Sequence, residues 1–256
     1  MSDLSPPPAK PRRALGRFRA VIFDVDGTLV DSERDGHRVA FNRAFAEAGI
    51  PDRWDPEEYG RLLAVTGGQR RIAHHLAARG MPRAEAASRA AALHRRKTEI
   101  FAEMVRAGEI APRQGVPELL DALRAHGVTV AVATTGTGAW VRPLLDRLFG
   151  PERFAVVVTA DEEPALKPDP AAYRMVIRRL GIEPMEAIAV EDSANGLRAA
   201  RAAGLTCLVV SNDYTSGQDF AGAAAVFGGF GAGGPRSERL DYAALAAFAS
   251  VSTSAA

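Results

Sequence analysis

The chain has 256 residues, 47% of them hydrophobic, so it can bury a core that fills one large domain or two modest ones. Its formal net charge of +1 provides no overall field that would attract nucleic acid or an anionic membrane, so neither is expected as a partner. The single cysteine, Cys207, excludes an intramolecular disulfide and fits a reducing cytoplasm, where we expect the protein.

The first 17 residues are rich in proline and basic residues and lack the apolar run of a secretory signal. We therefore expect residues 1–17 to form a disordered basic tail. A short tail without interleaved aromatic residues gives little support to a nucleic-acid site. No later stretch is long and apolar enough to predict a membrane span.

The predicted elements fall into two patterns along the chain. The run AVIF at 20–23 predicts a short strand that stops at Asp24. From about 33 to 107 the apolar spacing is helical, including one long segment at 83–106. After Pro112, helices alternate with the apolar runs VTVAVAT, FAVVVTA, AIAVED and TCLVVS, as in a parallel sheet. A loop is expected at 228–234 and a final helix in DYAALAAFA.

These patterns predict an α/β fold, with a Rossmann-like parallel sheet core and an inserted helical cap domain. We assign residues 18–32 and 111–256 to the core and residues 33–110 to the cap. Hinges are expected near 31–34 and 108–113. Ligands of such sheets bind outside the carboxyl ends of the strands, so polar residues at those ends are the first site candidates.

The sequence DVDGT places two carboxylates, Asp24 and Asp26, two positions apart at the end of the first predicted strand. Such a pair suits phosphoryl transfer, in which one carboxylate attacks and the other moves a proton. Alternatively, Asp26 is an ordinary turn or cap residue, since Asp and Gly are common in turns. The position at a strand end favours the catalytic interpretation.

Two further strand ends carry groups that can bind phosphate. Thr134 or Thr135, at the end of VTVAVATT, offers a hydroxyl together with nearby backbone N–H groups. Lys167, in ALKPDP beyond the third apolar run, offers an ammonium group. Taken alone, a threonine at a strand end is commonplace, and a loop lysine is typical of a solvated surface.

Adjacent acids, Glu191 and Asp192, end the apolar run AIAVED, and Ser193 can cap the helix that follows. Neighbouring carboxylates at a strand end repel each other unless a cation is present. Magnesium prefers oxygen ligands and usually keeps waters beside one or two carboxylates and a substrate phosphate. The pair therefore indicates a Mg²⁺ site, and the alternative is a capped helix with one exposed acid.

In combination, DxDGT, a strand-end threonine, a lysine and ED resemble the four-motif signature of haloacid dehalogenase (HAD) superfamily phosphatases, over residues 18–210. Within that superfamily, SERDGHRVAFN, VTGGQRR, LHRRKTEIF and NDYTSGQDF are most similar to the CbbY group. Known CbbY members are xylulose-1,5-bisphosphate phosphatases, and β-phosphoglucomutases are less similar. The resemblance implies a Mg²⁺-dependent phosphoric monoester hydrolase that forms an aspartyl phosphate and acts on a small phosphorylated sugar. We expect a monomer.

The resemblance also implies a role for each matching position. The catalytic positions are Asp24, Asp26, Thr134 and Lys167. The metal positions are Asp24, Asp26 through its carbonyl, Asp192, and Glu191 as a supporting acid. The substrate-binding positions are Glu33, His37, Arg70, Arg71, Lys97 and Thr135. Asp24 is expected to be the nucleophile and Asp26 the general acid and base. When substrate binds, we expect the neighbouring carboxylate and the phosphate to raise the pKa of Asp26.

Two positions depart from the CbbY pattern. Gln69 stands where these relatives usually have lysine, and Leu166 replaces a second lysine. Both changes remove positive charge, so a second substrate phosphate is expected to be held less tightly. His37 and Lys97 also have an alternative interpretation as plain residues of a helix surface.

The sequence leaves three alternatives to a sugar phosphatase. A phosphoglucomutase-type mutase would return the phosphoryl group to the sugar rather than to water. A non-catalytic module that binds phosphorylated ligands is disfavoured, because all four motifs carry chemically competent residues. Dehalogenases of this superfamily lack the second aspartate that Asp26 provides, which disfavours that activity.

Overall fold

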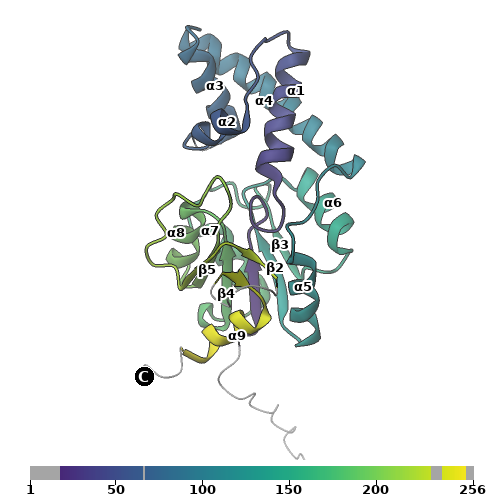
Figure 1. Cartoon of the computed structure of the whole chain (residues 1–256), viewed down its shortest axis with the longest axis vertical. Helices are drawn as coiled ribbons and strands as arrows, with labels where there is room; N and C mark the ends of the chain where they lie inside the picture. Colours follow the sequence, from purple (N-terminus) through teal and green to yellow (C-terminus); the bar gives the residue numbers. More distant parts are fainter. Residues whose placement is uncertain (1–17, 66, 232–237, 252–256) are drawn as a thin grey trace, which may run out of the picture.

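The computed structural model describes residues 18–65, 67–231 and 238–251, so the tail predicted at 1–17 lies outside the described residues. Its centre is a parallel six-stranded sheet in the order β3-β2-β1-β4-β5-β6 (Figure 1). The strands are β1 (Ala20–Phe23), β2 (Thr129–Ala133), β3 (Val156–Val158), β4 (Ala187–Glu191), β5 (Thr206–Val210) and β6 (Ala225–Phe227). The chain runs outward from β1 to β3 and then returns to β4. Strands β1 and β4 therefore flank the switch point where open α/β sheets bind ligands.

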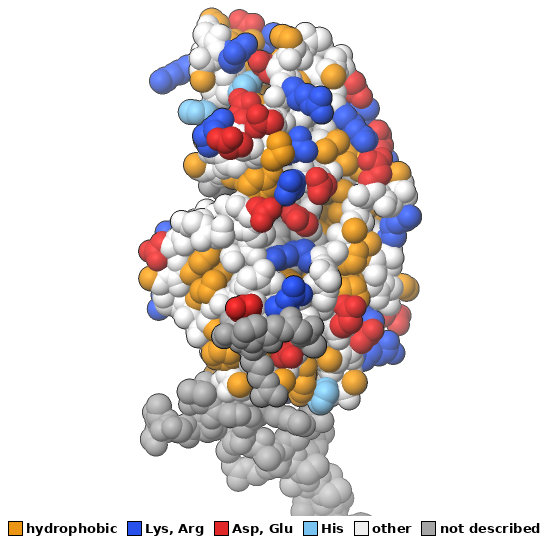
Figure 2. All heavy atoms as spheres, in the orientation of Figure 1, with side chains coloured by type: hydrophobic (Ala, Val, Ile, Leu, Met, Phe, Trp, Pro, Cys, Tyr) orange, Lys and Arg blue, Asp and Glu red, His pale blue; other side chains and the backbone are white. Residues whose placement is uncertain are grey.

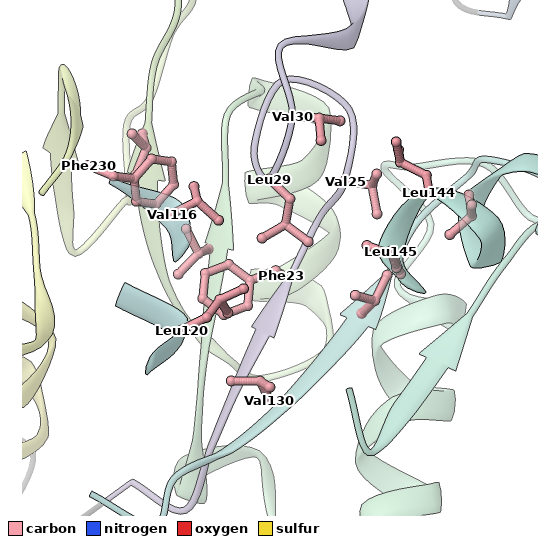
Figure 3. Close-up of a cluster of buried hydrophobic side chains, with 14 of the residues drawn as sticks. Phe23, Val25, Leu29, Val30, Val116, Leu120, Val130, Leu144, Leu145 and Phe230 are labelled. Atoms are coloured by element: carbon pink, nitrogen blue, oxygen red, sulfur yellow. The ribbon is translucent and has the colours of Figure 1, made fainter. Parts of the chain in front are cut away.

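Alternation along β1 explains how this strand comes to lie inside the molecule. Val21 and Phe23 pack into a cluster on one face of the sheet, whereas Ala20 and Ile22 pack into a cluster on the other. The first face is covered by α5 (Val116–Ala125), α6 (Gly138–Phe149) and α9 (Tyr242–Val251), and the second by α7 (Ala171–Leu180) and α8 (Ala194–Ala202). Figure 3 shows part of the first cluster around Phe23. The predicted α/β parallel-sheet fold is confirmed.

Between β1 and α5 lies a group of helices that we call the helical segment, residues 33–107. Its elements are the π-helix η1 (Glu33–His37), α1 (Arg38–Glu47), α2 (Pro56–Leu62), α3 (Gly68–Ala78) and α4 (Arg83–Ala107). Asp55 caps α2 by accepting a hydrogen bond from the Glu58 backbone at 2.8 Å. A cluster of aromatic and aliphatic side chains, including Phe41, Phe45 and Trp54, fills the space between these helices. The helical segment lies at the end of the molecule opposite α9 (Figure 1).

Helix α4 belongs to both hydrophobic regions. Its Ala90 and Leu93 lie in the cluster of the helical segment, whereas Ile100 and Phe101 lie in the sheet cluster of Figure 3. The helix ends at Ala107 and is capped by Gly108, whose backbone is left-handed with φ of 77°. A single continuous helix thus connects the helical segment to the sheet.

The C-terminal part of the structure contains strands that the sequence patterns did not predict. These are β6 at the sheet edge and the two-stranded pair of β7 (Gly229–Phe230) and β8 (Arg239–Leu240). The loop expected at 228–234 was therefore wrong at Gly229–Phe230, where the buried Phe230 ring anchors the chain. A short 3-10 helix, η2 (Pro184–Glu186), precedes β4. Within the described ranges, no helix has both the length and the apolar character that a membrane span requires.

Candidate active site

A cavity of about 680 Å³ lies where the carboxyl ends of the strands face the helical segment. Figure 2 shows the surface indented between the two parts, with acidic and basic side chains along the boundary. The predicted site residues that line the cavity are Asp24, Asp26, Glu33, His37, Arg70, Arg71, Lys97, Thr135, Lys167 and Asp192. Thr134 and Glu191 are buried beside it and are absent from its described lining. The structure therefore brings residues from distant parts of the chain to one edge of the sheet.

The turn after β1 places the first carboxylates. The Asp24 backbone N–H donates to the Val190 carbonyl at 3.1 Å, which continues the β1–β4 ladder as far as the acid. Gly27 has a left-handed φ of 81°, and a Cβ at this position would lie 2.3 Å from Asp192 Oδ2. Only glycine lets this turn lie directly against Asp192.

A buried network surrounds Asp24. The Lys167 ammonium lies 2.5 Å from Asp24 Oδ1 and 2.5 Å from Glu191 Oε1, and it donates to the Ala133 carbonyl at 3.0 Å. The Tyr173 hydroxyl donates to the same Glu191 oxygen at 2.5 Å. Burial raises the pKa of Asp24 to about 7, and Lys167 opposes this rise. Burial alone would lower the pKa of Lys167, but Asp24 and Glu191 outweigh it and raise the pKa.

Asp192 completes an acidic cluster that fits a divalent cation. One carboxylate oxygen from each of Asp24, Glu191 and Asp192 lies within 4.8 Å of the others, and all three residues are buried. Burial, followed by repulsion from Asp24 and Glu191, raises the pKa of Asp192 well above its usual value. The Asn212 amide donates to Asp192 Oδ2 at 2.8 Å. Hard oxygen donors that destabilise one another when ionised are suited to Mg²⁺.

Within this cluster, Glu191 is fully buried and is not among the residues that line the cavity. Its Oε1 accepts hydrogen bonds from Lys167 and Tyr173. Its Oε2 is buried, without a hydrogen-bond partner among the described residues, and a Cβ on Gly196 would lie 1.9 Å from it. This position suits an acid that holds Lys167 in place behind the two aspartates.

The Asp26 side chain is more exposed than that of Asp24, at 20% against 9%. The Ser32 hydroxyl donates to Asp26 Oδ1, and His37 Nε2 lies 3.0 Å from the same oxygen. The Lys97 ammonium lies 2.8 Å from His37 Nδ1 and can only donate, so Nδ1 accepts and Nε2 carries the proton that faces Asp26. His37 therefore presents a hydrogen-bond donor to the Asp26 carboxylate.

The hydrogen-bond partners of Asp26 lower its pKa in the protein without substrate. Burial raises it, but His37, Ser32 and Lys97 together outweigh burial and leave the pKa below its usual value. The side chains that stabilise the carboxylate come from the turn after β1 and from the helical segment. The rise expected when substrate binds concerns a different state of the protein and stays a prediction. Lys97 is itself buried, which lowers its pKa to about 8.

Of the two threonines after β2, Thr135 is the one that lines the cavity. Thr134 is 1% exposed, and its hydroxyl accepts a hydrogen bond from the Gly136 backbone at 3.0 Å. Thr134 thus stabilises the turn, while Thr135 and the following residues Gly136 and Thr137 face the cavity.

On the opposite wall, Tyr59 fixes two predicted substrate-binding residues. Its hydroxyl donates to Glu33 Oε2 and accepts from Arg71 Nη1 at 3.1 Å. The Arg71 guanidinium also lies 5.2 Å from the centre of the Tyr59 ring and donates through Nε to the Leu62 carbonyl at 3.0 Å. Arg71 is consequently held in place, whereas the neighbouring Arg70 is exposed at the cavity rim.

Four residues of this network were not predicted as site residues: Ser32, Tyr59, Tyr173 and Asn212. Ser32 and Asn212 lie in the segments SERDGH and NDYTSGQ, whose similarity to the CbbY group is the sequence signal for them. Tyr59 and Tyr173 are fully buried on amphipathic helices, where a sequence pattern indicates only core packing.

Comparisons with known proteins agree with this arrangement. The family model described as haloacid dehalogenase-like hydrolase matches residues 18–204. The chain is 44% identical over 210 residues to protein CbbY of Cereibacter sphaeroides, covering 80% of this chain and 90% of that protein. It is 34% identical over 218 residues to phosphoglycolate phosphatase 1 of Pseudomonas aeruginosa, with coverages of 83% and 76%.

Among solved structures, a mutant of CbbY from Rhodobacter sphaeroides in complex with xylulose-1,5-bisphosphate is similar at a TM-score of 0.69. It shares 41% sequence identity with this chain, and the match covers 82% of this chain and 93% of that one. The family match includes both the sheet strands that carry the acids and the whole helical segment. The chain therefore belongs to the haloacid dehalogenase-like hydrolase family, as a phosphatase of CbbY type.

Proposed function

We propose that this phosphatase is Mg²⁺-dependent and hydrolyses a small sugar bisphosphate such as xylulose-1,5-bisphosphate through an aspartyl phosphate on Asp24. The observation that carries the proposal is the placement of Asp24 beside Lys167 at 2.5 Å and within reach of Asp192, at the floor of the cavity. The CbbY structure with xylulose-1,5-bisphosphate supports the choice of sugar.

Attack by Asp24 on phosphorus requires the repulsion between carboxylate and phosphate to be offset. Lys167 supplies one positive charge next to the Asp24 carboxylate. The carboxylates of Asp24 and Asp192 and the backbone carbonyl of Asp26 would hold Mg²⁺, which when bound neutralises further charge on the phosphate oxygens. Glu191 keeps Lys167 oriented, and Thr135 with the backbone after β2 would bind the phosphate, with Thr134 supporting the turn.

Asp26 would move the protons in both steps. It protonates the leaving sugar oxygen, and its carboxylate form then draws a proton from the water that attacks the aspartyl phosphate. The lowered pKa of Asp26 in the free protein suits the second step directly. In the first step, the negative charge of a bound substrate phosphate would raise that pKa.

The helical segment would act as the cap that selects the substrate, with residues 33–110 inserted in a core of 18–32 and 111–256. Arg71 is the fixed cation on the cap side and Arg70 the exposed one, and both suit a second phosphate. Gln69 and Leu166 line the same cavity without a charge, so the arginines carry this recognition. Glu33, His37 and Lys97 would bind the sugar.

The test is release of inorganic phosphate, with and without Mg²⁺, from xylulose-1,5-bisphosphate, ribulose-1,5-bisphosphate and hexose phosphates. We expect metal-dependent release that is fastest with a pentulose bisphosphate. The Asp24→Asn variant should form no trappable phospho-enzyme, whereas Asp146→Asn, an exposed position on α6, should behave as wild type.

Two outcomes would contradict the proposal. Isomerised sugar phosphate without phosphate release would identify a mutase. Binding without metal-dependent turnover would identify a module that only binds phosphorylated ligands.

A further inference from the structure

The loop after β5, residues 211–218, is tied to the acidic end of the sheet. The Asn212 amide donates to Asp192 Oδ2 at 2.8 Å and to the Gly27 carbonyl at 3.3 Å. Farther along, Gln218 Oε1 accepts a hydrogen bond from the Ala194 backbone at 2.8 Å, at the start of α8. The loop therefore has a fixed position relative to both turns that carry the catalytic acids.

The same loop also contacts the helical segment through Tyr214. The Tyr214 ring lies 6.0 Å from the Tyr59 ring, centre to centre, at an angle of 72°. Its Cδ1 lies so close to Gly60 that a Cβ there would be 3.0 Å away. Beside it, Arg34 and Asp213 form an ion pair at 3.1 Å. In Figure 1 the loop rises from β5 towards α2. Its Asn212 and Tyr214 both line the cavity.

Tyr214 brings a polar group to the cavity. The side chain lines the cavity, yet its hydroxyl is buried without a hydrogen-bond partner among the described residues. A buried hydroxyl without a partner is unfavourable, so such groups usually have a ligand or another function. The Tyr214 backbone N–H donates to Asn212 Oδ1 at 2.9 Å, which fixes the backbone from which the side chain extends.

We infer that Tyr214 is a specificity-determining residue, whose hydroxyl binds an oxygen of the sugar while its ring holds α2 over the substrate. This inference rests on the proposed sugar phosphatase function. It concerns the part of the substrate that is remote from the reacting phosphorus, because the Tyr214 ring contacts Tyr59, whose hydroxyl accepts from Arg71. Binding energy at such a position distinguishes a sugar from a smaller phosphate ester.

The experiment compares Tyr214→Phe with wild type on two substrates, the sugar bisphosphate and acetyl phosphate, which is too short to reach the cap wall. Loss of one hydrogen bond predicts about a tenfold fall in kcat/KM for the sugar, mainly through KM, and a loss at least several-fold smaller for acetyl phosphate. Tyr214→Ala removes the ring as well and should widen the difference between the two substrates.

Tyr242→Phe is the matched control, because Tyr242 lies on α9 and stacks on His126 outside the cavity lining. Equal losses of kcat/KM on both substrates would overturn the role assigned to Tyr214 and leave the proposed function untouched. Wild-type kcat/KM of Tyr214→Phe for the sugar would do the same. A wild-type protein that releases phosphate from no sugar would refute the proposed function, and this assignment with it. Thermal unfolding of each variant shows whether it is folded.

Discussion

Lys97 is expected to reduce the stability of the folded protein at neutral pH, and the Lys97→Met variant tests this. The residue is 7% exposed, and its ammonium lies 4.9 Å and 5.2 Å from the ring centres of Phe41 and Phe101. Burial lowers its pKa from 10.5 to about 8, although Glu33 and Asp26 oppose the change. The folded protein therefore carries a buried charge that the unfolded chain exposes to water.

The size of the effect depends on pH, because the two states lose the Lys97 proton at different values. Between pH 8 and 10.5 the unfolded chain keeps the proton while the folded protein releases it, so stability rises with pH across this window. The difference between the two pKa values corresponds to a penalty of about 3 kcal/mol at pH 7, which falls to about 1 kcal/mol at pH 10.

The assay is urea unfolding of wild type and Lys97→Met at pH 7 and at pH 10. Methionine fills a similar volume and does not titrate. The gain in unfolding free energy of Lys97→Met over wild type should therefore be about 2 kcal/mol larger at pH 7 than at pH 10. Arg95→Met, at an exposed position of α4, is the control whose difference from wild type should not change between the two pH values. A Lys97→Met difference that is equal at both pH values would refute the reasoning.

Two further predictions concern the metal and the turn after β1. Mg²⁺ should stabilise wild type by about 2.7 kcal/mol at a hundred times its Kd, which is measured as a rise in melting temperature. Asp192→Asn should abolish this rise. An undiminished rise in the variant would count against this metal site. Arg113 donates to the carbonyls of Gly27 at 2.5 Å, Val210 at 3.0 Å and Ser211 at 2.8 Å. Arg113→Lys keeps the charge but loses the planar guanidinium that donates to several carbonyls at once. The variant should therefore lose about 1–3 kcal/mol of unfolding free energy in urea. An unchanged unfolding midpoint would show that these hydrogen bonds do not contribute to stability.

The sequence patterns identified the helices and strands whose apolar residues recur at a regular spacing. The strand at 20–23 and the helices at 33–107 lie where they were expected, because buried strands and long amphipathic helices leave clear apolar patterns. Strand β6 and the β7–β8 pair were missed, since strands of three and two residues at an edge are too short to show alternation. Their pairing depends on contacts made elsewhere in the chain.

The candidate site was predictable as far as topology determines it. Asp24, Lys167 and Asp192 converge because each follows a parallel strand of the same sheet. The lowered pKa of Asp26 was not predictable, because it depends on where Ser32 and His37 place their polar atoms. The choice between Thr134 and Thr135 likewise depends on the local turn, which a strand-end pattern leaves open.

Helix α4 packs into two hydrophobic clusters, and this restricts how the cavity can open. At about 1.5 Å per residue, its 25 residues form a rod about 38 Å long, with one half in each hydrophobic cluster. A swing about 31–34 and 108–113 alone would pull Ile100 and Phe101 away from Trp140 on α6, exposing aromatic surface to water. Opening therefore requires α4 to shear along α6 or to bend between Leu93 and Ile100, so substitutions in this buried helix interface would alter substrate entry without touching the substrate.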